Sequence, residues 1–111
     1  MASGSAAAGA ACGRRSAESR AAERAQDACI GALGPVAERR TPSPEAVGQS
    51  RADAEAAAGV DDRWVPLVAA VRKLEATRGT PGFDPAVDAL TAECSRVNEI
   101  VRRGGKEPAD A

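Results

Sequence analysis

Apolar residues recur at alternating intervals of three and four along residues 85–103, which is the spacing of one face of an α-helix. The row consists of Val87, Leu90, Cys94, Val97 and Val101. Asp84 and Pro85 fit the N-cap and the first helical position, and Gly104 follows where helices commonly end. The pattern therefore predicts a helix over 85–103 with a cysteine at the centre of its buried face.

A second apolar row predicts a helix over residues 63–78. Its members are Trp64, Leu67, Val68, Val71 and Leu74. Asp61 and Asp62 precede the row, where negative charge opposes the positive end of the helix dipole. Because Pro66 lies too deep for the first helical position, we expect the regular helix to begin near Val65. This row has the densest large apolar residues in the chain, so it should supply much of the core.

A third helix is predicted over residues 17–33 from its ends and from a row of small residues. Ser16 can serve as N-cap, and Gly34 with Pro35 forms a stop signal. The inward row is Ala22, Ala25, Cys29, Ala32 and Leu33. Small residues on this face would let a neighbouring helix approach closely.

A fourth helix is predicted over residues 44–58. Ser43 can cap it and Pro44 pre-sets the first turn. Its interior is weak, because Val47 is its only large apolar residue and Gly48 costs about 1 kcal/mol relative to alanine. We therefore expect this helix to depend on packing against its neighbours.

The four helices and their connections favour an all-α fold with one domain over residues 16–104. Connections of these lengths favour antiparallel neighbours, and the simplest arrangement is an up-and-down four-helix bundle. The alternative is a three-helix core with helix 44–58 lying across it. Residues 1–15, rich in Ala, Gly and Ser, are predicted to be a flexible tail, and residues 105–111 a polar C-terminal tail.

Composition limits the size of the core and the classes of ligand. The chain has 111 residues, and alanine supplies more than half of its 43% hydrophobic content, so little large apolar surface can be buried. The net charge of -1 and the presence of one Trp, one Phe and no Tyr argue against nucleic-acid binding. No apolar run approaches the roughly 18 residues of a membrane span.

The three cysteines are Cys12, Cys29 and Cys94, and their spacing is too wide for the paired ligands of a zinc site. Cys29 and Cys94 lie at the middle of the first and last predicted helices, which are antiparallel neighbours in an up-and-down bundle. One interpretation is a disulfide that closes a loop of about 66 residues and stabilises the fold by roughly 4 kcal/mol. The other is a pair of reduced thiols that pack as small apolar residues.

Cys12 ends the stretch "AAAGAAC", which is similar to the small-residue segment before the lipid-bearing cysteine of bacterial lipoproteins. If translation starts upstream of Met1, Cys12 is a candidate for lipidation. Gly9 departs from the motif, which usually has Leu or Val there, and the alternative is a solvated tail. A lipoprotein and a disulfide agree with each other, because both belong to an oxidising compartment.

The residue inventory offers little for catalysis. The chain has no histidine, which removes the commonest general base and the Ser-His and Cys-His pairs. An enzyme would have to use carboxylates such as Asp88 and Glu93, which no motif brings together. We predict no catalytic residue, no cofactor and no metal site. Trp64 is either the largest piece of the core or an anchor at an interface.

These observations favour a non-enzymatic small helical protein with a binding or structural role, exported or associated with the cell envelope. A protein partner or self-association is expected, without nucleic acid and without a membrane span. The alternative is a cytoplasmic helical adaptor or subunit that completes its thin core against a partner chain. The two hypotheses differ in the redox state of Cys29 and Cys94.

Overall fold

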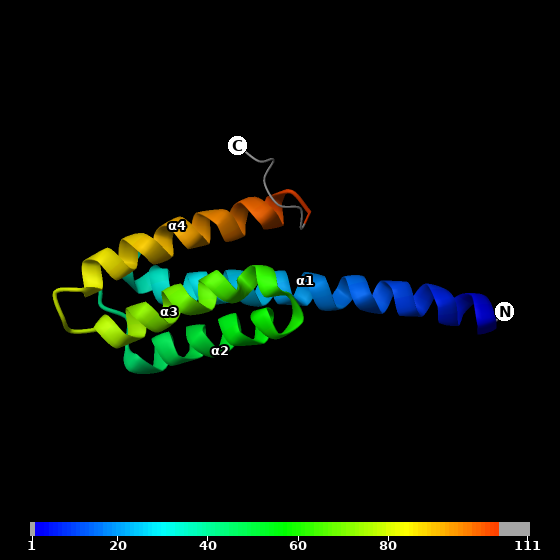
Figure 1. Cartoon of the computed structure of the whole chain (residues 1–111), viewed down its shortest axis with the longest axis horizontal. Helices are drawn as coiled ribbons and strands as arrows, with labels where there is room; N and C mark the ends of the chain where they lie inside the picture. The colour runs from blue at the N-terminus through cyan, green and yellow to red at the C-terminus, as the bar shows by residue number, and fades with distance from the viewer. Residues whose placement is uncertain (1, 105–111) are drawn as a thin grey trace.

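The computed structural model describes the backbone of residues 2–104 and the side chains of residues 17–104. It contains four α-helices and one short 3-10 helix, η1, in the stretch between α2 and α3 (Figure 1). Their bounds are α1 (Ala2–Ala37), α2 (Pro44–Val60), η1 (Asp62–Trp64), α3 (Val65–Thr77) and α4 (Phe83–Arg102). Within residues 2–104 there is no strand. The all-α prediction is confirmed.

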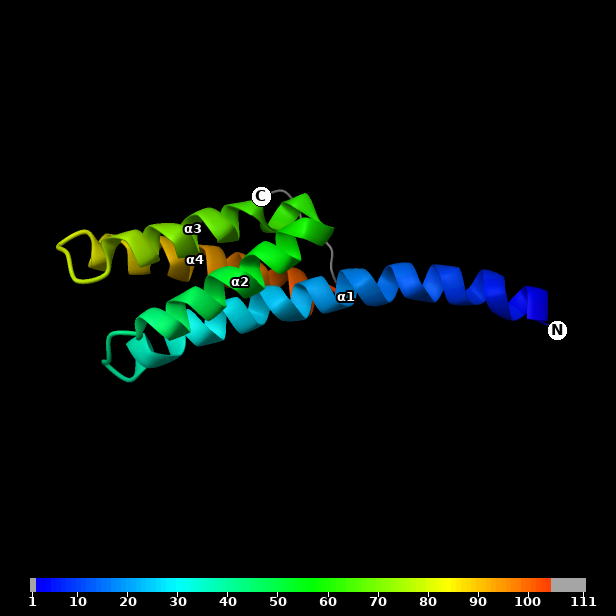
Figure 2. The ribbon, with the colours of Figure 1, turned by 90° about the horizontal axis from the view of Figure 1, so that it is seen from below.

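The helices form an up-and-down bundle, as predicted. Each helix packs against the next along the chain, and α4 returns to pack against α1. Figures 1 and 2 show α2 lying alongside α1 and α3, so the alternative in which this helix crosses a three-helix core is wrong. The N-terminal part of α1 projects beyond the other three helices (Figure 2).

The predicted ends of the first helix are wrong, because α1 begins at Ala2 and ends at Ala37. Residues 2–15 are helical rather than a separate tail, consistent with the high helix propensity of alanine. Whether this segment is mobile stays a prediction. The tail over 105–111 lies outside the described residues.

Pro35 does not end α1, although the sequence suggested a stop there. A proline has a helical φ but lacks an N–H donor, and inside a helix its ring crowds the carbonyl four residues earlier, which usually bends or ends the helix. Here α1 continues for two residues beyond Pro35. The helix ends in a Schellman motif, in which the Arg40 N–H donates to the Pro35 carbonyl and the Arg39 N–H to the Val36 carbonyl. Arg39 has a φ of 60°, the left-handed region that glycine usually occupies there.

The third helix begins at Val65, as Pro66 indicated. The Asp61 side chain accepts a hydrogen bond from the Arg63 N–H at 3.0 Å and caps η1. Asp61 also ends α2, because its own N–H donates to the Ala57 carbonyl. A single residue therefore ends one helix and starts the next turn.

The last helix begins at Phe83, earlier than the predicted N-cap at Asp84. The turn before it supplies the missing cap, because the Thr80 hydroxyl accepts from the Gly82 N–H at 3.1 Å and the Thr80 carbonyl from the Phe83 N–H. Asp84 lies in the first turn, where its charge opposes the helix dipole.

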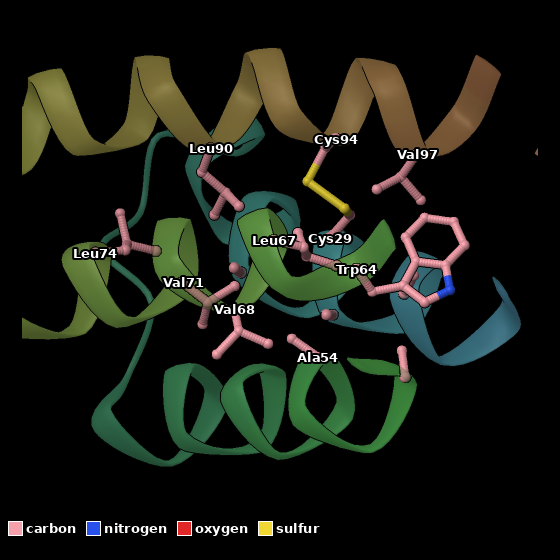
Figure 3. Packing of buried hydrophobic residues seen from close by; sticks show 14 of the residues in the cluster. Cys29, Ala54, Trp64, Leu67, Val68, Val71, Leu74, Leu90, Cys94 and Val97 are labelled. Carbon is pink, nitrogen blue, oxygen red and sulfur yellow. A yellow bond between two sulfur atoms is a disulfide. The ribbon is translucent and has the colours of Figure 1, made fainter. Parts of the chain in front are cut away.

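The core has two parts of different character. α3 and α4 contribute large apolar side chains to the core (Figure 3), whereas α1 and α2 contribute mostly alanines. A Cβ added at Gly31 of α1 would lie 2.8 Å from the Ser50 Oγ of α2, which shows how closely these helices approach. The buried alanines of these two helices are Ala21, Ala25, Ala28 and Ala32 on α1, with Ala54 and Ala57 on α2.

Ion pairs cross two of the helix seams. Arg24 of α1 reaches the nearly buried Asp53 of α2, with 2.8 Å between Nη1 and Oδ1. On the outer side of α2 and α3, Arg72 donates to Glu55 at 2.7 Å. This hydrogen bond, with the charge of Arg51, lowers the pKa of Glu55 below its ordinary value. Arg51 also reaches Glu75 on α3 at 2.9 Å. These contacts fix the register of α2 between its neighbours.

Candidate functional site

Cys29 of α1 and Cys94 of α4 form a disulfide in the structure (Figure 3). Their Cα atoms are 5.7 Å apart, and the two residues are 6% and 4% exposed. Of the two interpretations of these cysteines, the structure has the cross-link rather than the reduced thiols. The bond joins the first helix to the last and lies inside the seam between them.

The disulfide lies between two clefts of the α1–α4 seam. One is formed near residues 18–26 of α1 and the end of α4, and the other near the end of α1 and the start of α4. Because the helices are antiparallel, the clefts lie on opposite sides of the disulfide. The bond therefore joins α1 to α4 at the middle of their contact, with one cleft on each side of it.

The first cleft has a volume of about 500 Å³, within the range of ordinary ligand sites. Three segments far apart in the sequence form it: α1, the η1 corner and the last turn of α4. Its lining residues are Glu18, Ser19, Ala22, Glu23, Gln26, Asp61, Arg63, Trp64, Val101 and Gly104.

Local contacts fix the η1 side of this cleft. Arg63 pairs with Asp61 at 2.8 Å between Nε and Oδ2, and its guanidinium lies 6.0 Å from the centroid of the Trp64 ring. Arg96 of α4 donates to the Arg63 carbonyl at 2.5 Å and is itself held by Glu93. The η1 corner is therefore tied to α4.

The α1 side of the cleft is acidic. Glu18 and Glu23 are exposed, and within residues 17–104 neither carboxylate has an ion-pair partner. Ala22 lies between them in the sequence and is partly buried against the core. The cleft thus combines unpaired negative charge with an apolar surface.

The second cleft, of about 460 Å³, lies at the other end of the seam. Its lining residues are Val36, Arg39, Arg40, Thr41, Phe83, Asp84, Val87 and Asp88. Glu93, the other carboxylate considered for catalysis, bonds Arg96 instead. The structure does not bring Asp88 and Glu93 together, and no reaction follows from either.

Trp64 is 2% exposed and packs in the core (Figure 3), and it also lines the first cleft. Cys12 lies in the part of α1 whose side chains are not described, so its lipidation stays a prediction. Within the described residues, no group of three or more His, Cys, Asp or Glu side chains could hold a metal ion. No helix in that part of the chain is long and apolar enough to cross a membrane.

The first cleft is the feature that sequence reasoning missed. Its residues come from three segments that are far apart in the sequence. Glu23 by itself looks like an ordinary residue of a solvated helix face. The sequence carries no clear signal for this cleft, because Arg14, Arg15 and Arg20 lie within one helical turn of Glu18 or Glu23.

Comparison with known proteins found no matching family model, no matching curated protein and no matching solved structure.

Proposed function

We propose that this protein is a small non-enzymatic binding protein of an oxidising compartment, exported or associated with the cell envelope. The observation that carries the proposal is the Cys29–Cys94 disulfide between the first and last helices. Structural disulfides persist in oxidising environments and are rare where glutathione and thioredoxin keep thiols reduced. A small alanine-rich core is the kind of fold for which such a cross-link contributes most.

A binding role is supported by what the surface offers. Most large apolar side chains of α3 and α4, among them Leu67, Leu74 and Leu90, are buried within one chain. The first cleft then presents an apolar floor with two exposed carboxylates, Glu18 and Glu23, beside it. These features suit the recognition of a partner more than a reaction.

The redox state of the cysteines in the cells that make the protein tests this proposal. Cells are lysed in denaturant with iodoacetamide, so that buried free thiols are blocked as well. The protein is then reduced, and newly released thiols are labelled with a second, heavier reagent. We expect Cys29 and Cys94 to take only the second label. A matched control is the Cys29→Ala variant, in which Cys94 should take the first label once the protein is denatured. First-label modification of both cysteines in the denatured wild type would overturn the proposal.

A cytoplasmic helical adaptor or subunit that completes its core against a partner chain is the second candidate. Three large apolar residues favour it, because Ile30 is 68% exposed and Val60 and Val65 are each 51% exposed. This candidate predicts reduced Cys29 and Cys94 in the cell, and helicity that rises with protein concentration. Circular dichroism over a hundredfold dilution series checks the second point.

Lipidation at Cys12 is a separate part of the exported hypothesis. It predicts that the mature protein begins at this cysteine, with acyl chains attached. Mass spectrometry of the intact protein from its native cells tests it, and Cys12→Ser should abolish partitioning into a detergent phase. A mature mass without acyl groups would contradict lipidation and leave the disulfide proposal standing.

A further inference from the structure

The apolar part of the first cleft suits the stem of a long side chain. Ala22 and Val101 are partly buried residues packed against the core, and both line the cleft with the edge of Trp64. Long basic side chains place their methylene stems along such surfaces while the charged head stays in water. The cleft therefore offers the apolar half of a site for an amphipathic side chain.

The charges around the cleft are predominantly negative. Among the described residues, four charged side chains line the cleft, of which three are acidic, and the fourth, Arg63, is paired with Asp61. Glu18 and Glu23 are thus the charges available to a ligand. They lie five residues apart on α1 and both line the cleft, so one ligand with two cationic groups could contact both carboxylates.

The end of α4 adds to this potential. Val101 and Gly104 line the cleft, so the carbonyl end of the helix, which carries partial negative charge, is near it. Arg102 and Arg103 at the same end both bond Glu99 and are not part of the lining.

We propose that this cleft binds a basic peptide segment of a partner protein, with arginine or lysine heads on Glu18 and Glu23 and an apolar neighbour over Ala22 and Val101. This inference rests on the proposed binding function and names its partner's chemistry. Nucleic acid is disfavoured by the same negative charge.

The test uses the oxidised full chain and the peptide acetyl-Ala-Arg-Leu-Arg-Ala-amide. Trp64 is the only tryptophan, so its emission reports on the cleft without interference from the peptide. Calorimetry gives a second readout that does not depend on the indole. We expect saturable binding that weakens as salt is added, and about fivefold weaker binding of the same peptide with citrulline in place of arginine, as two exposed charge pairs would give.

The protein variant Glu18→Gln/Glu23→Gln should bind the arginine peptide about fivefold more weakly than the wild type does. The matched control is Asp27→Asn/Asp88→Asn, which changes the net charge equally but lies outside the cleft, and it should bind as the wild type does. Equal binding of the arginine and citrulline peptides, equal losses in both variants, or no saturable signal in either readout would overturn the proposal. An oxidised protein that fails this test refutes the cleft assignment alone, whereas reduced cysteines in the cell refute the proposed compartment alone.

Discussion

Cys29 and Cys94, separated by 65 positions in the sequence, lie with their Cα atoms 5.7 Å apart and their sulfurs bonded. The bond ties α1 to α4 between the two clefts of their seam. In an up-and-down bundle these helices are the chain's first and last, so no short connection holds them together. The disulfide supplies that connection.

Removal of the disulfide should destabilise the fold severely. A cross-link that closes a loop of about 66 residues stabilises by roughly 4 kcal/mol in the chain-entropy model, which is a large share of the stability of a small domain. We expect Cys29→Ala/Cys94→Ala to lower the free energy of unfolding by about that amount in urea titrations followed by circular dichroism. Cys12→Ala is the control and should leave the midpoint unchanged. A double variant as stable as the wild type would contradict this role.

The sequence was sufficient to predict the parts of the fold that large side chains determine. Trp64, Leu67 and Leu90 belong to rows whose periodicity is unambiguous, so α3, α4 and the bundle topology could be predicted. The proximity of Cys29 and Cys94 followed from that topology, because the midpoints of antiparallel first and last helices face each other. The sequence left a disulfide and a pair of reduced thiols as alternatives, and the structure has the disulfide.

Alanine periodicity carried less information. Ala22 was predicted to face inward, but Ala21 and Ala28 are the buried residues and Ala22 is only partly buried. When alanines occur on several faces of a helix, spacing alone does not identify the face that packs. The ends of α1 were missed for a related reason, since Pro35 acts locally and the Schellman motif beyond it uses an arginine where glycine is the usual signal.

Ser50 and Gly31 should show a measurable coupling. The Ser50 hydroxyl is buried with no hydrogen-bond partner, so Ser50→Ala should stabilise the protein by about 1 kcal/mol. Gly31→Ala alone should gain stability from the higher helix propensity of alanine. It should lose that gain again, because the new Cβ would lie 2.8 Å from the Ser50 Oγ.

The double variant removes the obstacle, because among the described residues the Ser50 Oγ is the only atom outside the nearby backbone of α1 within 4 Å of the added Cβ. We therefore expect Gly31→Ala/Ser50→Ala to be more stable than the sum of the single changes, by about 0.5 kcal/mol or more. Thermal unfolding of the four proteins in the cycle measures this coupling. Strict additivity would argue against the close approach of α1 and α2.

Arg39 is predicted to be a suboptimal residue at the end of α1. Its left-handed backbone costs about 1 kcal/mol for a residue with a Cβ and almost nothing for glycine. We expect Arg39→Gly to raise the unfolding free energy by a few tenths to about 1 kcal/mol, measured in denaturant titrations. Arg40→Gly, next to it, should destabilise or have no effect. A loss of stability in Arg39→Gly would mean that the helix does not end in a Schellman motif.

Glu55 should contribute to stability only above acidic pH. Its folded pKa is lowered, chiefly by the hydrogen bond from Arg72, so its contribution is fully present above the unfolded pKa of about 4.5 and is lost as pH falls through the folded value. The stability difference between wild type and Glu55→Gln should therefore be positive at pH 7 and shrink at pH 3. In an Arg72→Ala background the pH dependence should be smaller, and an equal dependence in both backgrounds would contradict this ion pair.

A disulfide map of the oxidised protein is the most direct test of the bond between Cys29 and Cys94 that joins α1 to α4. Digestion with trypsin without reductant, with free thiols blocked beforehand, separates the cysteines into peptides 1–14, 25–39 and 79–96. Mass spectrometry should find peptide 25–39 linked to peptide 79–96, with the cysteine of peptide 1–14 outside any bond to either. Finding 25–39 and 79–96 as separate blocked peptides would contradict the bond and the proposed compartment, and finding either of them linked to 1–14 would also contradict the helix arrangement.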